Sequence, residues 1–176
     1  MVVRSSDNLD ISVYDDFFPI DIQKEIFHKL MTSHAWSYTG GGEISRFWHV
    51  DGLENDDYFS SFLYDKICQN LNKKFSAFSR IYANGQTSCQ YGVPHIDDGD
   101  MTFLYYPNLE WQLTWQGGLF FIKNKNHPGE FTIFPSYVPH YTTRHYSFIP
   151  RITLAMDFSL LYPFEMVDRR QNWVML

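Results

Sequence analysis

The sequence lacks the features that mark secreted, membrane-spanning and nucleic-acid-binding proteins. No run of about eighteen apolar residues is present to span a membrane, and residues 1–10 lack the apolar core of a secretory signal. The only cysteines, Cys68 and Cys89, form no CxxC motif, and we expect both to be free thiols. The net charge of −6 opposes attraction to a phosphate backbone. We therefore expect a cytoplasmic protein with no membrane contact and no nucleic-acid partner.

Aromatic side chains, by contrast, are abundant. They make up 19% of the 176 residues, within an apolar content of 44% that is ordinary for a globular protein. The length is close to that of one typical domain, so we expect residues 1–176 to form a single domain. Because aromatic residues are enriched in strands and in concave ligand sites, the composition favours a β-rich fold with a pocket.

The N-terminal part of the chain predicts a strand over 11–18 and then two helices, which form a helical support over about 20–75. Asp21 is placed to cap the first helix, and the second begins near Asp56. Each helix has one apolar stripe at helical spacing: Ile22, Ile26, Phe27, Leu30 and Met31 in the first, and Phe59, Phe62, Leu63, Ile67 and Leu71 in the second. Three glycines at 40–42 predict a break, followed by a loop or edge strand over 43–50.

From residue 79 onward the chain reads as short strands separated by turn signals. The expected strands are 80–83, 102–106, 112–115, 119–122, 130–134, 137–143 and 151–158. Asn84-Gly85, Asp98-Gly99 and Gly117-Gly118 are among the turn signals between them. Strands that follow two helices predict an α+β, mainly β protein, with a two-sheet core over about 79–159 and the helices packed outside one sheet. Residues 160–176 show no regular pattern.

His95-Ile96-Asp97 is the sharpest local motif. In an extended segment residues i and i+2 point to the same face, so this imidazole and this carboxylate point toward one place. Taken alone, the motif also fits a solvated acidic turn over 97–100. His140 follows after several predicted strands and supplies a third ligand. Two histidines and one carboxylate form the facial triad that binds non-haem iron and leaves three coordination positions open.

Arg151 opens a predicted strand with two different faces. One face holds Arg151, Thr153, Ala155 and Asp157 and suits a ligand pocket, whereas the other is aliphatic. Fe(II), the Asp97 carboxylate and the Arg151 guanidinium together leave two positive charges in a partly buried site, which favours a dianion. 2-Oxoglutarate is such a dianion. Its 2-oxo acid end can chelate the metal at two open positions, and its far carboxylate can accept two parallel hydrogen bonds from the Arg151 guanidinium. One position is left for O2.

The segment from Arg80 to Phe158 contains several short motifs, and the order in which they follow one another is informative. They are Tyr82-x-Asn84-Gly85, Pro94-His95-Ile96-Asp97, Thr102-x-x-Tyr105-Tyr106-x-Asn108-x-x-Trp111, Gly117-Gly118, Phe134-Pro135-Ser136 with His140, and Arg151. In this combination the sequence resembles the prolyl 4-hydroxylase branch of the Fe(II)/2-oxoglutarate-dependent dioxygenase superfamily. The resemblance implies a double-stranded β-helix core, which is the jelly-roll or cupin-like fold.

The resemblance implies specific roles for six residues. The implied metal ligands are His95, Asp97 and His140, and the implied cosubstrate-binding residues are Arg151, Tyr106 and Tyr82. It implies hydroxylation of a C–H bond with release of succinate and CO2, a prolyl residue of a peptide or protein as the leading substrate, and stimulation by ascorbate. A small-molecule substrate also fits.

Two residues compete with the assigned ones, and two other functional classes stay open. His145 competes with His140, but a spacing of five would put it on the opposite face of a continuous strand. Arg144 competes with Arg151, and we expect it to be a surface charge.

A metal-dependent cupin-type hydrolase or isomerase would use the same triad without needing Arg151. A non-catalytic jelly-roll binding module would need no metal. Residues 43–50 fit either a mobile lid or an edge strand.

Overall fold

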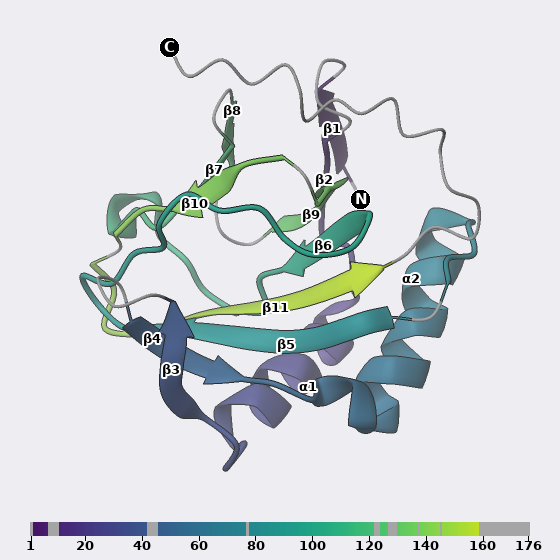
Figure 1. Ribbon diagram of the computed structural model, residues 1–176, viewed down its shortest axis with the longest axis horizontal. Helices are drawn as coiled ribbons and strands as arrows, with labels where there is room; N and C mark the ends of the chain where they lie inside the picture. Colours follow the sequence, from purple (N-terminus) through teal and green to yellow (C-terminus); the bar gives the residue numbers. More distant parts are fainter. Residues whose placement is uncertain are drawn as a thin grey trace.

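The computed structural model describes residues 2–6, 11–41, 46–76, 78–121, 124–126, 130–136, 138–144 and 146–158 (Figure 1). Its α-helices are α1 (Ile20–Met31) and α2 (Tyr64–Leu71), and a π-helical segment, Tyr58–Leu63, leads into α2. Two 3-10 turns cover Leu53–Asn55 and Leu113–Trp115. Among the residues described, no helix is both long enough and apolar enough to cross a membrane.

The strands form two antiparallel sheets. The larger runs in the order β1-β2-β9-β6-β11-β5-β4-β3, and the smaller in the order β10-β7-β8. The strands are β1 (Val2–Ser6), β2 (Ile11–Asp15), β3 (Ser37–Gly41), β4 (Arg46–Val50), β5 (Phe78–Gln86), β6 (Met101–Tyr105), β7 (Leu119–Phe121), β8 (Asn124–Asn126), β9 (Glu130–Pro135), β10 (His140–Thr142) and β11 (Arg151–Phe158). Figure 1 shows α1 and α2 against one face of the large sheet and the small sheet across the other. The predicted mainly β fold with two supporting helices is confirmed.

β11 lies between β5 and β6, and each of its residues is buried. Its aliphatic and aromatic face packs toward the helices in one apolar cluster, Ile152, Leu154, Met156 and Phe158. Ala155, on the other face, belongs to a second cluster between the sheets. The predicted alternation is therefore confirmed. A central strand with both faces covered fixes its own register, because a slip of one residue would exchange the two faces.

The helices hold the large sheet through their apolar stripes. Ile26 of α1 and Ile67 of α2 are both fully buried in the cluster under the sheet. Asp21 does not cap α1, because the helix begins beside Pro19 and no side chain bonds to its first backbone N–H groups. Asp21 lies in the first turn, where its carboxylate still favours the positive end of the helix dipole.

Replacing Ile26 by Ala should lower the free energy of unfolding by about 2–5 kcal/mol, because a fully buried side chain would leave a cavity under the sheet. Ile20→Ala in the same helix is the matched control, since Ile20 is 58% exposed and its loss should cost less than about 0.5 kcal/mol. Chemical denaturation of both variants checks this. Equal losses would show that α1 is not packed as described.

The predicted turn at Asn84-Gly85 is wrong, because both residues lie inside β5. Gly85 pairs with Ile152 on one side and with Trp48 on the other. A Cβ at Gly85 would come within 3.1 Å of the Trp36 ring, so the glycine serves close packing and not a turn. Of the break predicted at 40–42, Gly40 and Gly41 instead lie in β3 and pair with β4, and Gly42 lies outside the described residues.

Two other predicted strands differ from the structure. Residues 113–115 form a 3-10 turn in place of a strand, closed by the Trp115 N–H, which donates to the Gln112 carbonyl at 2.9 Å. Gln112 is exposed, and the segment has no neighbouring strand among the described residues to pair with. Of residues 43–50, 46–50 form β4, which pairs with β3 and β5, and 43–45 lie outside the described residues. β6 ends at Tyr105, one residue earlier than predicted and two before Pro107, which has no backbone N–H to extend the pairing.

Candidate metal centre

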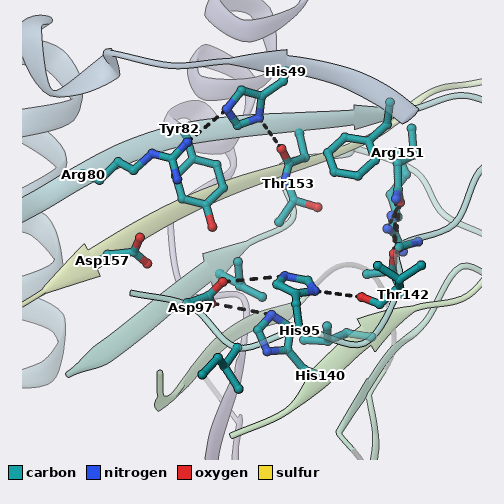
Figure 2. Close-up of a pocket in the computed structure, with 18 of the residues that line it drawn as sticks. His49, Arg80, Tyr82, His95, Asp97, His140, Thr142, Arg151, Thr153 and Asp157 are labelled. Carbon is teal, nitrogen blue, oxygen red and sulfur yellow. Dashed lines mark hydrogen bonds and ion pairs between the residues drawn. The ribbon is translucent and has the colours of Figure 1, made fainter. Parts of the chain in front are cut away.

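A cavity of about 520 Å³ lies between the two sheets (Figure 2). β11 and β5 of the large sheet supply one wall, including Arg151, Asp157 and Tyr82. His140 of the small sheet and the segment that holds His95 supply part of the opposite wall. The cavity therefore brings together residues that are far apart in the sequence.

Three of its side chains converge. The Nε2 atom of His95 is 3.6 Å from Oδ1 of Asp97, and the Nε2 atom of His140 is 3.5 Å from Oδ2 of the same carboxylate. One ligand atom from each residue lies within 4.8 Å of the other two. Figure 2 shows the three side chains turned toward one another. We call His95, Asp97 and His140 the triad.

Backbone pairing between distant segments builds the triad. His95 and His140 form an antiparallel bridge, with N–H to carbonyl distances of 3.0 and 2.9 Å in the two directions. The Asp97 N–H donates to the Ser136 carbonyl at 3.0 Å. These two contacts hold the backbone of 95–97 against 136–140, and the His95 and Asp97 side chains point to the same side, as their spacing predicts.

The orientation of both imidazoles suits metal binding. Nδ1 of His95 lies 2.9 Å from the Val93 carbonyl, and Nδ1 of His140 lies 3.1 Å from the Val138 carbonyl. A carbonyl accepts only, so each Nδ1 carries the hydrogen, and in the neutral ring each Nε2 presents a lone pair. Burial lowers the pKa of His140, which favours this neutral form.

A cation would satisfy groups that the protein leaves unsatisfied. Oδ2 of Asp97 is buried and has no hydrogen-bond donor among the described residues. The neutral imidazoles offer it only acceptor nitrogens. Three acceptors around one point repel each other unless a positive ion lies between them, and nitrogen and carboxylate ligands in this ratio suit Fe(II). The residues present therefore fit a divalent metal.

Arg151 lies in the same cavity and is 2% exposed. Its guanidinium donates from Nη1 to the Gly117 carbonyl and from Nη2 to Oε1 of Gln86, while Nε has no hydrogen-bond partner among the described residues. No carboxylate of those residues forms an ion pair with it, and desolvation lowers its pKa. A buried guanidinium without a counterion favours an anionic ligand.

The competing residues are placed differently. Arg144 is exposed on the surface, with its guanidinium 5.0 Å from the centre of the Tyr91 ring. His145 lies outside the described residues. Tyr106 is buried and lines the cavity, and its ring centre is 6.0 Å from Cζ of Arg151. Tyr82 lines the opposite part of the cavity, beside Asp157 (Figure 2).

A second polar group of the cavity wall was missed by the sequence reasoning. Nδ1 of His49 lies 2.6 Å from Oδ1 of Asn84, and its Nε2 lies 2.9 Å from Oδ2 of Asp51. Arg80 completes the group by donating to Oδ1 of Asp51 at 2.6 and 3.0 Å. His49 has no partner at metal-ligand spacing in the sequence, so no local motif points to it. The signal was the pairing of β4 with β5, which places His49 opposite Asn84.

Comparison with solved structures gives the fold an independent assignment. A prolyl-4-hydroxylase from Pseudomonas putida superposes with a TM-score of 0.65 at 18% identity, over 88% of this chain and 94% of that one. This chain has the fold of prolyl hydroxylases. The viral collagen prolyl hydroxylase of Paramecium Bursaria Chlorella virus-1, solved as a 2-oxoglutarate complex, gives 0.62 at 14% identity, over 83% and 93%.

The same fold also serves a different reaction. The non-haem, α-ketoglutarate-dependent epimerase SnoN of nogalamycin biosynthesis superposes with a TM-score of 0.64 at 9% identity, over 85% of this chain and 77% of that one. No family model and no curated protein matches the sequence. The fold is therefore assigned by structure, and the chemistry has to be argued from the residues of the cavity.

Proposed function

We propose that the protein is an Fe(II)- and 2-oxoglutarate-dependent dioxygenase that hydroxylates a C–H bond of its substrate. One observation carries the proposal: the triad and a buried guanidinium without a counterion face the same cavity. In the balanced reaction, 2-oxoglutarate, O2 and the substrate give succinate, CO2 and the hydroxylated substrate. One oxygen atom of O2 enters succinate, and the other enters the product.

Each residue has a role that follows from its place. His95, Asp97 and His140 hold the metal through two Nε2 atoms and one carboxylate. Bound there, Fe(II) supplies the reduction of O2 that the protein's side chains cannot carry out. Arg151 binds the far carboxylate of 2-oxoglutarate, with its Nε available for one of the hydrogen bonds. Tyr106 adds a phenol at this end and Tyr82 lines the pocket.

Charge supports the pairing of this metal with this cosubstrate. The metal carries a charge of +2, the Asp97 carboxylate −1 and the Arg151 guanidinium +1. The net charge of the site without the cosubstrate is therefore +2. A dianion brings the total to neutrality, and a buried site is most stable when its charges are compensated. A hydrolase or isomerase that acts only through metal-bound water has no use for a buried guanidinium, so Arg151 favours the oxygenase.

We propose a peptide or protein as the substrate, with a prolyl residue as the first candidate. The shared fold with prolyl hydroxylases supports this choice. The cavity of about 520 Å³ is in the range of small-molecule sites, so free amino acids belong in the same assay. We also propose a cytoplasmic location. Stimulation of turnover by ascorbate is tested in the same assay.

The test is turnover of 2-oxoglutarate by the full chain. With Fe(II) and air, the protein should release succinate and CO2, ascorbate should prolong activity, and one peptide or amino acid of the panel should gain the mass of one oxygen atom. N-oxalylglycine, a mimic that does not react, should block all of this. Failure to consume 2-oxoglutarate, or product formed equally well with Zn(II), would favour the hydrolase alternative.

A further inference from the structure

A second charged side chain lies on the cavity face of β11. Asp157 is on the same face of the strand as Arg151 but six residues further along, which is about 20 Å in an extended chain. It is 2% exposed and lines the cavity. Figure 2 shows Arg151 to one side of the triad and Asp157 to the other. The strand therefore carries a cation at one end of the cavity and a carboxylate at the other.

The protein offers the Asp157 carboxylate few hydrogen bonds and no ion pair among the described residues to compensate for its burial. The Thr102 hydroxyl is 3.5 Å from Oδ1, which is a long hydrogen bond, and the same hydroxyl is 2.9 Å from that of Ser136. Arg80, whose positive charge acts on Asp157, is held by Asp51 at 2.6 Å, and its guanidinium lies over the Tyr82 ring at 4.3 Å. No cation of the described residues forms an ion pair with Asp157.

The ionisation of Asp157 reflects this environment. Burial, with the negative charges of Asp97 and Asp98, raises its pKa to about 7, and the Arg80 charge and the Thr102 hydrogen bond only partly oppose this rise. A carboxylate shielded from water gains most from a positively charged partner that enters the cavity. Asp157 is not one of the three residues whose ligand atoms converge, so it is not needed to hold the metal.

With the metal and 2-oxoglutarate bound, the charges of the cavity are balanced except at Asp157. The metal, 2-oxoglutarate, Asp97 and Arg151 balance, and Arg80 balances Asp51. Asp157 remains as a buried carboxyl group of the cavity wall that has no positively charged partner among the described residues. We infer that the substrate carries a cationic amine or guanidinium group that pairs with Asp157 while its reacting C–H bond faces the metal. This inference rests on the proposed function and specifies its substrate class.

The test compares binding of matched cationic and neutral probes. The full chain is loaded with Mn(II) and N-oxalylglycine so that no turnover occurs, and affinities are measured by calorimetry. One probe pair is free L-arginine and L-citrulline. The other is a prolyl peptide with lysine or N6-acetyl-lysine beside the proline, on either side. We expect the cationic member of at least one pair to bind about tenfold or more tightly, as for a hydrogen bond to a charged group.

Two variants assign the preference to a residue. Asp157→Asn keeps the shape and the acceptor for Thr102, and should reduce the preference to within about twofold. Asp98→Asn removes an exposed carboxylate at the cavity rim and should retain most of it. A preference that persists in Asp157→Asn, or that falls equally in both variants, would overturn the inference.

The wild-type protein tests the inference without any variant. If it consumes 2-oxoglutarate but binds both members of every pair equally, the inference fails and the proposed function stands. If it neither binds N-oxalylglycine nor consumes 2-oxoglutarate, the proposed function fails and the inference fails with it.

Discussion

Asp97→Ala should abolish turnover of 2-oxoglutarate. The substitution removes the one carboxylate of the triad and leaves two neutral imidazoles, which bind a ferrous ion without charge compensation. The side chain is 6% exposed and its two oxygens face histidine Nε2 atoms, and Asp97 is the carboxylate whose ligand atom converges with theirs. Metal content after dialysis, together with succinate release, measures the effect.

Asp98→Ala is the control for this variant. Asp98 follows directly in the chain and lines the cavity rim, but it is exposed and is not part of the triad. It should retain metal and most of the turnover. The assignment of Asp97 as a ligand fails if Asp97→Ala, shown by circular dichroism to be folded, still binds Fe(II) with the affinity of the wild type.

Arg151→Ala should weaken the binding of 2-oxoglutarate by roughly a hundredfold or more. Removal of one partner of a buried ion pair costs about 3–5 kcal/mol, because the other charge is left uncompensated. Arg151→Lys should recover only part of the affinity, since an ammonium cannot form the two-pronged contact of a guanidinium. Titration of the metal-loaded protein measures each dissociation constant.

Arg144→Ala serves as the control for Arg151. Both residues are arginines of the same region, but Arg144 is exposed and lies over Tyr91, whereas Arg151 is buried in the cavity. We expect the affinity of Arg144→Ala for 2-oxoglutarate to match that of the wild type. An unchanged affinity in Arg151→Ala would mean that another cation binds the cosubstrate.

Short-range pattern predicted much of this fold. The period-two alternation along 151–158 placed Arg151 and Asp157 on one face and the apolar residues on the other, because a central strand must bury both faces. The spacing of two between His95 and Asp97 similarly put them on one side of an extended segment. Both patterns depend only on the geometry of neighbouring residues.

Long-range pairing produced the features that the sequence did not predict. Gly85 reads as a turn residue, and only the Trp36 ring against its backbone explains a glycine in the middle of β5. The polar group around His49 forms because β4 pairs with β5 in one particular register, which no local pattern specifies. Asp157 likewise has no ion-pair partner in the described part of the chain, because Arg80 forms its ion pair with Asp51, a contact that no local pattern specifies.

A crystal structure of the protein with Mn(II) and N-oxalylglycine would test the central claim most directly. We expect anomalous density from one ion, coordinated by Nε2 of His95, Nε2 of His140 and one oxygen of Asp97. The far carboxylate of the mimic should accept hydrogen bonds from the Arg151 guanidinium. An ion bound elsewhere, or a mimic bound away from Arg151, would contradict the oxygenase assignment.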